Sequence, residues 1–209
     1  MKQSDLLNHG SIKEALSPNS IEHISKLIVL DEVDSTNSLL IRELNEGNGP
    51  VLVCVAKQQT AGRGRSGKVW HSPLSKNIYL SLSWEYKVPS NKIEGLSLAI
   101  GIVILNVLAD FGYSNLKLKW PNDILYDGAK LAGILVELIG DSRSSLRIIT
   151  GIGINISMSV TAGSAIGRPW TDLSSIRGQS PPSRNELLAM LINRLIDFFA
   201  FYPEKGFVC

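Results

Sequence analysis

One short stretch of the chain, residues 62–68, concentrates residue types that could do chemistry. It reads Gly-Arg-Gly-Arg-Ser-Gly-Lys, so three glycines and three cations stand in seven positions. Glycine lets the backbone adopt positive φ and approach a ligand closely, and arginine offers a planar fork of donors that matches phosphate or carboxylate oxygens. The stretch alone is consistent with a loop that clamps an anion and equally with a basic surface loop that has weak affinity for nucleic acid.

Two predicted strands flank this loop and must position it. Residues 51–56 are almost continuously apolar, which is typical of a strand buried on both faces. Residues 77–84 alternate between apolar and polar side chains, as a half-buried strand does. A turn at residues 70–73 lies between the loop and the second strand, and we expect its His71 to have a surface or packing role. The cationic loop therefore connects the ends of two strands.

A second polar group stands where a strand is followed by a helix. Residues 27–30 are typical of a short strand, and helical spacing of leucines up to Leu44, with Gly47 as a stop, predicts a helix that follows it. Between them lies Asp-Ser-Thr-Asn at residues 34–37. These residue types are those that cap a helix, which is the favoured interpretation. The hydroxyls and the free N–H groups of the helix start could also bind the polar head of a ligand, and both roles are compatible.

The rest of the chain predicts one mixed α and β fold. Apolar residues nearly encircle the helix expected at 91–112, which indicates a central buried helix, whereas residues 1–26 are polar, contain a turn at 17–20 and show no chemistry. Strands outnumber helices and neighbours pair as hairpins, so we expect an α+β fold: a mixed, largely antiparallel sheet packed with helices on one face. The further expected elements are strands at 116–120, 131–139 and 146–156, turns at 126–129 and 140–143, an irregular segment at 157–184 and a helix at 185–202.

The composition limits the class of protein. The chain has 209 residues, 44% of them hydrophobic, which suits one domain with an ordinary core. With 21 Lys and Arg against 19 Asp and Glu, it is too evenly charged for a general nucleic-acid or membrane-surface binder. Cys54 and Cys209 are expected to be unpaired, and neither a secretory signal nor a membrane span is visible. These features predict a cytoplasmic location.

Chemically useful side chains recur where predicted strands end or turn. Each group has a structural explanation by itself, such as a cap, a turn, a solvated lysine or a bulge. Their occurrence together, in this order, indicates a site. The groups are Ser35-Thr36-Asn37, Gln59 with Arg63 and Arg65, Lys119-Trp120-Pro121-Asn122-Asp123, Lys130, and Gly151-Ile152-Gly153-Ile154-Asn155.

These groups supply cations but no nucleophile. The sequence contains no GxSxG elbow, no HExxH motif and no activated-cysteine pattern, which argues against a covalent enzyme intermediate. Several cations around a glycine-rich loop suit attack of a carboxylate on the α-phosphate of a nucleotide, because negative charge grows on the phosphate oxygens as pyrophosphate leaves. Adenylation of a carboxylate is therefore the predicted reaction type.

Four of these motifs closely resemble the biotin protein ligases, also called biotin–[acetyl-CoA-carboxylase] ligases. The resemblance covers roughly residues 30–205 and implies the class II synthetase-like catalytic domain of biotin and lipoate ligases. It also implies a reaction in two steps: biotin and MgATP give biotinyl-5′-AMP and pyrophosphate, and a lysine of a biotin carboxyl carrier domain then attacks the mixed anhydride. The motifs are Gln59 to Trp70, Trp120 to Asp123 after Lys119, Lys130 to Glu137, and Gly151 to Asn155.

The same resemblance implies roles for individual residues. Biotin would be bound by Ser35, Thr36, Asn37, Gln59, Gly62, Arg63, Arg65, Lys130 and Gly133. The nucleotide would be bound by Arg65, Trp70, Asn122, Lys130, Asn155 and Trp170, with Trp170 stacked on adenine in a loop that orders when nucleotide binds. The catalytic group would be Arg65, Lys119, Asp123 and Lys130. Metal ligands are not identified.

Two departures from the family pattern stand out. Ser66 occupies a position where many relatives carry another basic residue, which puts retention of the adenylate in doubt. Many relatives also continue into a small C-terminal β-barrel domain, and others begin with a DNA-binding winged helix. We expect an N-terminal extension at 1–26, a catalytic domain at 27–205, neither extra domain, no DNA binding, and a monomer or weak homodimer.

Two other functions remain open at this point. One is a module that binds biotin or biotinyl-AMP but transfers it poorly, which the short C-terminus suggests. The other is a lipoate or octanoate transferase of similar fold. The Arg-Gly-Arg sequence at 63–65 and the Trp-Pro-Asn-Asp turn at 120–123 argue against the second.

Overall fold

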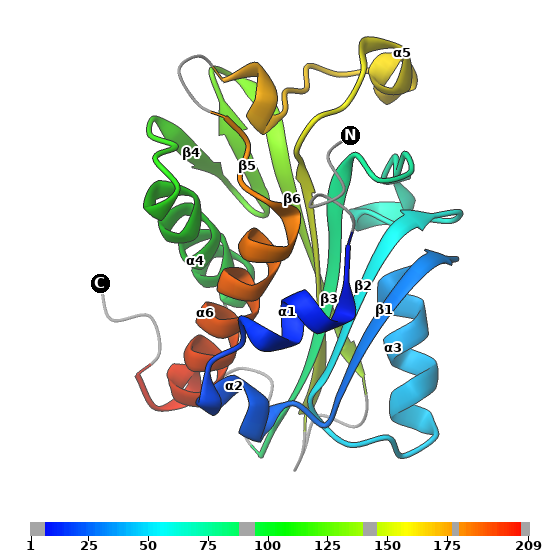
Figure 1. The fold of residues 1–209 in the computed structure, drawn as a ribbon, viewed down its shortest axis with the longest axis vertical. Helices are drawn as coiled ribbons and strands as arrows, with labels where there is room; N and C mark the ends of the chain where they lie inside the picture. Colours follow the sequence, from blue (N-terminus) through cyan, green and yellow to red (C-terminus); the bar gives the residue numbers. More distant parts are fainter. Residues whose placement is uncertain (1–6, 88–94, 140–145, 177–179, 206–209) are drawn as a thin grey trace.

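A computed structural model describes residues 7–87, 95–139, 146–176 and 180–205. Within these residues a seven-stranded sheet has the order β1-β2-β3-β7-β6-β5-β4, in which β1 and β2 are parallel and every other pair is antiparallel (Figure 1). This confirms the mixed, largely antiparallel sheet. The strands are β1 (Lys26–Val33), β2 (Leu52–Gln59), β3 (Asn77–Tyr86), β4 (Leu116–Lys119), β5 (Asp123–Tyr126), β6 (Ala129–Ile139) and β7 (Leu146–Asn155).

Helices cover both faces of the sheet, so the prediction that they lie on one face was wrong. Helices α1, α4 and α6 contribute to one large core and α2 packs against α6, whereas α3 packs on β2, β3 and β7 around a separate small cluster. The alternation of β2 shows the two faces, because Val53 joins the large core and Cys54 joins the cluster under α3. The helices are α1 (His9–Glu14), α2 (Pro18–His23), α3 (Thr36–Asn45), α4 (Leu96–Asp110), α5 (Val160–Gly163) and α6 (Arg184–Lys205).

Burial corrects two further predictions. Strand β3 is buried on both faces rather than half-buried, because the hydroxyls at its polar positions are hydrogen-bonded inside the protein. Ser83, for example, accepts from Leu52 N at 2.9 Å and donates to Pro50 O at 3.0 Å. Helix α4 is not a central buried helix but packs on one face of the sheet against α6, and it leaves Ile102 44% exposed. The predicted start of this helix at residues 91–94 lies outside the described residues.

The N-terminal residues are more ordered than their polar sequence indicates. Residues 17–20 begin helix α2 instead of forming an isolated turn, with Ser17 as N-cap and Pro18 in the first turn. Ile12 of α1 and Leu16 are buried in the large core, and both short helices contact α6. They therefore help to cover the sheet.

Several local predictions are confirmed. Ser35 caps α3, and the hairpin between β5 and β6 turns at Asp127 and Gly128, whose φ angles of 47° and 78° suit a tight turn of that kind. The segment predicted to be irregular contains α5 and two short 3-10 helices, Ser164–Ile166 and Leu173–Ser175. The turn predicted at 140–143 and Cys209 lie outside the described residues. Among the described helices, none combines the length and apolarity needed to cross a bilayer.

Helix α6 provides a direct test of this packing. Phe199 is fully buried and stacks against Trp84, with ring centroids 5.7 Å apart. We expect Phe199→Ala to lower the free energy of unfolding by about 3–5 kcal/mol, because it removes a large buried ring and leaves a cavity. Phe201 in the same helix is 56% exposed, so Phe201→Ala should change stability by about 0.5 kcal/mol or less. Urea denaturation measures both, and equal effects of the two substitutions would contradict the assigned packing.

Candidate active site

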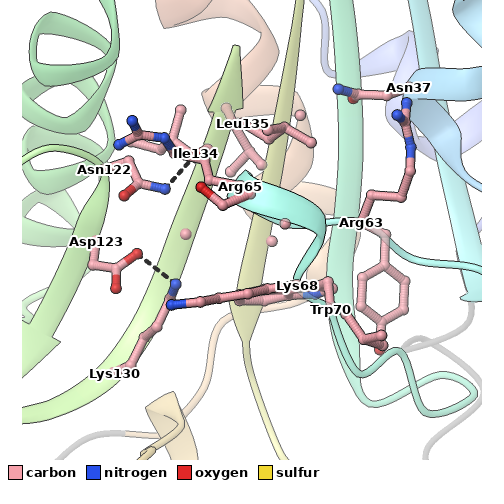
Figure 2. A pocket seen from close by; sticks show the side chains of 18 of the residues that line it. Asn37, Arg63, Arg65, Lys68, Trp70, Asn122, Asp123, Lys130, Ile134 and Leu135 are labelled. Carbon is pink, nitrogen blue, oxygen red and sulfur yellow. Dashed lines mark hydrogen bonds and ion pairs between the residues drawn. The ribbon is translucent and has the colours of Figure 1, made fainter. Parts of the chain in front are cut away.

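A cavity of about 450 Å³ lies on the face of the sheet that carries α3. The loop at 62–70, the start of α3, the turn at 119–123 and strands β6 and β7 contribute to its walls (Figure 2). Most residues predicted for the site meet here, although they come from four separated parts of the chain. The predicted residues that line it are Ser35, Thr36, Asn37, Gln59, Arg63, Arg65, Trp70, Lys119, Asn122, Asp123, Lys130 and Gly133.

The other three predicted residues lie beside the cavity. Asn155 and Trp170 line a smaller compartment of about 40 Å³, whose wall also includes Trp70 and Lys130. Gly62 is buried at the base of the loop, where a Cβ atom would come within 2.5 Å of the carbonyl oxygen of Trp70. The structure thus forms two adjoining compartments, with Trp70 and Lys130 between them.

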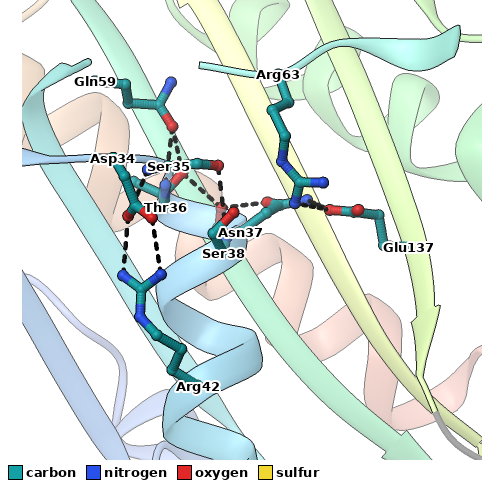
Figure 3. A network of polar contacts seen from close by, with 10 residues as sticks. Asp34, Ser35, Thr36, Asn37, Ser38, Arg42, Gln59, Arg63 and Glu137 are labelled. Atoms are coloured by element: carbon teal, nitrogen blue, oxygen red, sulfur yellow. Dashed lines mark hydrogen bonds and ion pairs between the residues drawn. The ribbon is translucent and has the colours of Figure 1, made fainter. Parts of the chain in front are cut away.

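One end of the large cavity is a polar network at the start of α3 (Figure 3). The backbone N and Oγ1 of Thr36 both donate to Gln59 Oε1, at 2.9 and 3.1 Å, and Gln59 Nε2 donates to Ser72 Oγ at 3.0 Å. The buried Ser81 Oγ lies 2.7 Å from Thr36 Oγ1 and 2.5 Å from Asn37 Oδ1. Donors and acceptors are therefore held in fixed places against an apolar sheet, which is an arrangement that recognises a small polar head group.

Glu137 of β6 completes this network and was given no role from the sequence. Its Oε2 accepts from Asn37 Nδ2 at 2.7 Å and from Arg63 Nη2 at 2.9 Å. This carboxylate joins the cationic loop to the start of α3 across the sheet (Figure 3). The sequence signal that could have identified Glu137 is its place in β6, where it follows Gly133 and Leu135 at a spacing of two and so faces the same side.

Asp34 fixes α3 from outside the cavity. Its carboxylate accepts two bonds from Arg42, at 2.8 and 2.9 Å, and one from Ser35 N at 2.8 Å. The hydrogen bonds from Arg42 lower the pKa of Asp34 to about 2. Both partners are about half exposed, so the pair orients the first turn of α3 and contributes little to stability.

The cationic loop folds back on itself as a narrow hairpin. Trp70 N donates to Gly62 O at 2.9 Å, Gly64 N donates to Lys68 O at 2.7 Å, and an isolated bridge pairs Arg63 with Val69. Arg65, Ser66 and Lys68 stand at its exposed tip and line the cavity. Ser66, at the position where the sequence departs from the family pattern, has a φ angle of 55°.

The other end of the large cavity is built around Lys130. Strand β6 has a register shift opposite Ile124 and Leu125, so that Lys130 and Gly133, three residues apart, both face the cavity. Lys130 is only 9% exposed and its ammonium forms an ion pair with Asp123 (Figure 2). Burial lowers the pKa of Lys130, and the neighbouring carboxylate of Asp123 opposes this shift.

Glycines shape the floor between the two ends. Gly133 and Gly153 are register partners on β6 and β7, and the ring of Trp70 lies on them so closely that a Cβ atom on Gly153 would overlap the indole. Lys130 Nζ stands 5.2 Å from the centre of this ring, a cation–π distance. The indole N–H of Trp70 is buried and has no hydrogen-bond partner among the described residues. A flat ring can therefore lie on this floor because side chains are missing there.

Backbone pairing ties the smaller compartment to Lys130. Lys130 N donates to Pro169 O at 3.1 Å, and Thr171 N donates to Lys130 O at 2.9 Å. The buried Asn155 supports this contact, because its Nδ2 donates to Thr171 O at 2.9 Å. Trp170 thus lies in register with Lys130, and its indole packs against Gly163, where a Cβ atom would overlap the ring.

The turn at 119–123 brings two further predicted residues to the cavity. Asn122 binds β6 through its side chain and its backbone: its Nδ2 donates to Ile134 O at 2.8 Å, and its backbone carbonyl oxygen accepts from Ile134 N at 3.0 Å. This contact holds Asp123 opposite Lys130, whereas Lys119 stands exposed at the end of β4. The chemical result is a cavity with a neutral polar end and a cationic end, suited to a ligand with a polar head and an anionic tail. The described residues contain no group of three or more His, Cys, Asp or Glu that could hold a metal ion.

The sequence of this chain is similar to a known protein family and to several of its characterised members. The model of the biotin/lipoate A/B protein ligase family matches residues 29–155. The bifunctional ligase/repressor BirA of Escherichia coli strain K12 is 40% identical over 204 residues, which cover 96% of this chain and 60% of BirA. The biotin–[acetyl-CoA-carboxylase] ligase of Paracoccus denitrificans is 30% identical, over 85% of this chain and 77% of that protein.

Solved structures agree with this result. The crystal structure of biotin protein ligase from Leishmania major in complex with biotinyl-5-AMP superposes with a TM-score of 0.70 and 26% identity, over 85% of this chain and 76% of that chain. The chain spans only about three fifths of the length of BirA. The family model covers more than half of the chain, and the structural comparison points to the same family as the sequence comparison. The chain belongs to the biotin/lipoate A/B protein ligase family.

Proposed function

We propose that this protein is a biotin protein ligase, which activates biotin with ATP and transfers it to a lysine of a biotin carboxyl carrier protein of acetyl-CoA carboxylase. The observation that carries the proposal is the pair of joined compartments with the buried Lys130 between them. The named activities of the relatives from Escherichia coli and Paracoccus denitrificans support it. The proposed location is the cytoplasm, because ATP and the carboxylase subunits are found in that compartment.

Biotin fits the large cavity in one orientation. Its ureido ring needs both donors and acceptors, which Ser35, Thr36 and Gln59 offer at the start of α3. Its apolar rings and valeryl chain would lie along β6 and β7 beside the ring of Trp70, which covers Gly133, and its carboxylate would reach Lys130 and Arg65. Gly62 and Arg63 shape the loop over this end, and Asn37 connects it to Glu137. A lipoyl group has no urea, so the hydrogen-bonding end of the cavity favours biotin.

The nucleotide fits the other side of Lys130. Trp170 and Asn155 line the smaller compartment, where adenine would stack on the indole of Trp170, and Trp70 forms the wall towards biotin. Asn122, Lys119 and Asp123 would hold the region of the α-phosphate together with Lys130. ATP would bind as its magnesium complex, so the metal ion enters as part of the substrate.

Adenylation then needs no nucleophile from the protein. A carboxylate oxygen of biotin attacks the α-phosphorus, the bond to the β-phosphate oxygen breaks, and pyrophosphate leaves with the electron pair. Lys130 and Arg65 would stabilise the charge that grows on the α-phosphate oxygens. In the second step the amine of the carrier lysine attacks the acyl carbon and expels AMP, and the lysine loses a proton as the amide forms.

A transfer assay tests this proposal. The protein is incubated with biotin, MgATP and a carrier domain, and mass spectrometry of the carrier domain should show one added biotinyl group on one lysine. Lipoate in place of biotin should give little product. An absence of labelling beside an active control ligase would refute the proposal, whereas tight binding of biotin by calorimetry without release of pyrophosphate would favour a binding module.

Lys130 provides a second prediction, on pH dependence. Because burial lowers the pKa of Lys130, kcat/KM for adenylation should fall as the pH rises through that lowered value, where the ammonium loses its proton. Lys130→Arg keeps the charge at high pH and should remove this decline, while it lowers activity at neutral pH about tenfold or more because the guanidinium does not fit the ammonium site. Biotin-dependent exchange between ATP and labelled pyrophosphate measures both.

Lys117→Arg is the matched control for this experiment. Lys117 stands exposed in β4, outside the set of residues that line the cavity, so its substitution should leave the pH profile unchanged. The same alkaline decline in wild type and Lys130→Arg would show that another group titrates. Equal loss of biotin affinity and adenylation in Lys130→Ala would show that Lys130 acts only in ground-state binding.

A further inference from the structure

Arg168 stands at the junction of the two compartments, and sequence reasoning gave it no role. It lines both the large and the small compartment, a property it shares with Val69, Trp70 and Lys130. Its side chain is 39% exposed, and its Nη1 lies 4.0 Å from Asp123 Oδ2. A ligand that extends from one compartment to the other must pass this guanidinium.

The backbone holds Arg168 in place relative to Lys130. Pro169, the next residue, accepts a hydrogen bond from Lys130 N, and Thr171 N donates to Lys130 O. Proline also fixes its own φ angle, which limits the paths that the chain can take between Arg168 and Trp170. The backbone pairing of residues 169 and 171 with Lys130 therefore positions both Trp170 in the small compartment and Arg168 at the junction.

The charges at the junction are unbalanced. Asp123 makes its close ion pair with Lys130, whereas the contact of Arg168 with Asp123, at 4.0 Å, is an ion pair without a hydrogen bond. The positive charges of Arg168 and Lys68 also help to lower the pKa of Lys130, and all three side chains line the large cavity. Asp123 thus pairs with two cations, Lys68 lines the same cavity, and a further anion would relieve the repulsion among these cations.

We propose that Arg168 binds the β- and γ-phosphates of ATP and stabilises pyrophosphate as it leaves. This inference rests on the proposed function for the identity of the nucleotide. With adenine at Trp170 and the α-phosphate at Lys130, the remaining phosphates lie at the junction beside Arg168. When the bond between the α-phosphorus and the bridging oxygen breaks, that oxygen gains negative charge, and a guanidinium can pair with two phosphate oxygens at once.

The role differs from that of Lys130 in one testable respect. Pyrophosphate is present in adenylation and absent when biotin is transferred from biotinyl-AMP to a carrier lysine. Arg168 should therefore matter for the first step and not for the second. A residue that only kept the segment 163–171 folded would affect both steps, because Trp170 in that segment contacts the nucleotide in each of them under the proposed function.

The experiment compares wild type, Arg168→Gln, Arg168→Lys and the control Arg194→Gln. Arg194 of α6 pairs with Asp110 of α4 at 3.2 Å and does not line either compartment. Three quantities are measured for each: binding of magnesium pyrophosphate by calorimetry, biotin-dependent exchange between ATP and pyrophosphate, and transfer from synthetic biotinyl-AMP to a carrier domain. The calorimetric arm requires no catalytic activity.

We expect Arg168→Gln to weaken binding of pyrophosphate and to slow exchange by about 10- to 100-fold, as the loss of a charged hydrogen-bonding partner does. Transfer from biotinyl-AMP should stay within about twofold of wild type. Arg168→Lys should recover part of the binding because it restores the charge, and Arg194→Gln should match wild type.

Other outcomes overturn the inference. Equal affinity of wild type and Arg168→Gln for pyrophosphate would overturn it, and so would a wild type that binds no pyrophosphate. An equal loss of exchange and transfer in Arg168→Gln would assign Arg168 a structural role instead. Failure of the proposed function looks different: wild type would then show no biotin-dependent exchange, while the calorimetric comparison would still decide whether Arg168 binds pyrophosphate.

Discussion

The ion pair between Lys130 and Asp123 is the interaction on which the site depends. A nearly buried ammonium is costly unless a carboxylate and hydrogen bonds compensate it, and Asp123 supplies the carboxylate from the neighbouring strand. The tight turn at 127–128 brings β5 and β6 together, and the register shift in β6 points Lys130 into the cavity. A short hairpin therefore determines where the cation stands, and the pairing of residues 169–171 with Lys130 places the smaller compartment beside it.

The floor of the site extends this arrangement across the sheet. Glycines on β6 and β7 leave room for flat groups, which Trp70 uses in the present structure, and Gly151 leaves room for Asn37 in the same way. The start of α3 can thus approach the sheet closely enough for Asn37 and Arg63 to share Glu137. Glu137 thus joins the loop to the helix start, and Trp70 of the same loop lies beside Lys130 at the cationic end of the cavity.

Local patterns predicted the elements well, whereas contacts between distant residues could not be predicted from them. The cap at Ser35 and the hairpin at Asp127 and Gly128 depend on residues next to one another, and both are confirmed. The pairing of Arg63 with Glu137 joins residues 74 positions apart, and no local signal specifies it. The alternation of apolar and polar residues in β3 predicted a half-buried strand. The sequence does not distinguish a serine hydroxyl that is hydrogen-bonded inside the protein from one that is exposed to water. The cation Arg168 was overlooked because it stands in an irregular segment, where no periodicity indicates which way a side chain points.

In the proposed reaction the biotin carboxylate itself attacks the α-phosphate of ATP, and the protein supplies positioned cations and no nucleophile. Biotin labelled with oxygen-18 in both carboxylate oxygens tests it most directly. After complete transfer to a carrier domain in the presence of MgATP, the AMP released should carry one labelled oxygen for each biotinyl group transferred, because the bridging oxygen of the anhydride stays with phosphorus when the amine attacks the acyl carbon. Carrier that is biotinylated while the AMP contains no label would contradict this account.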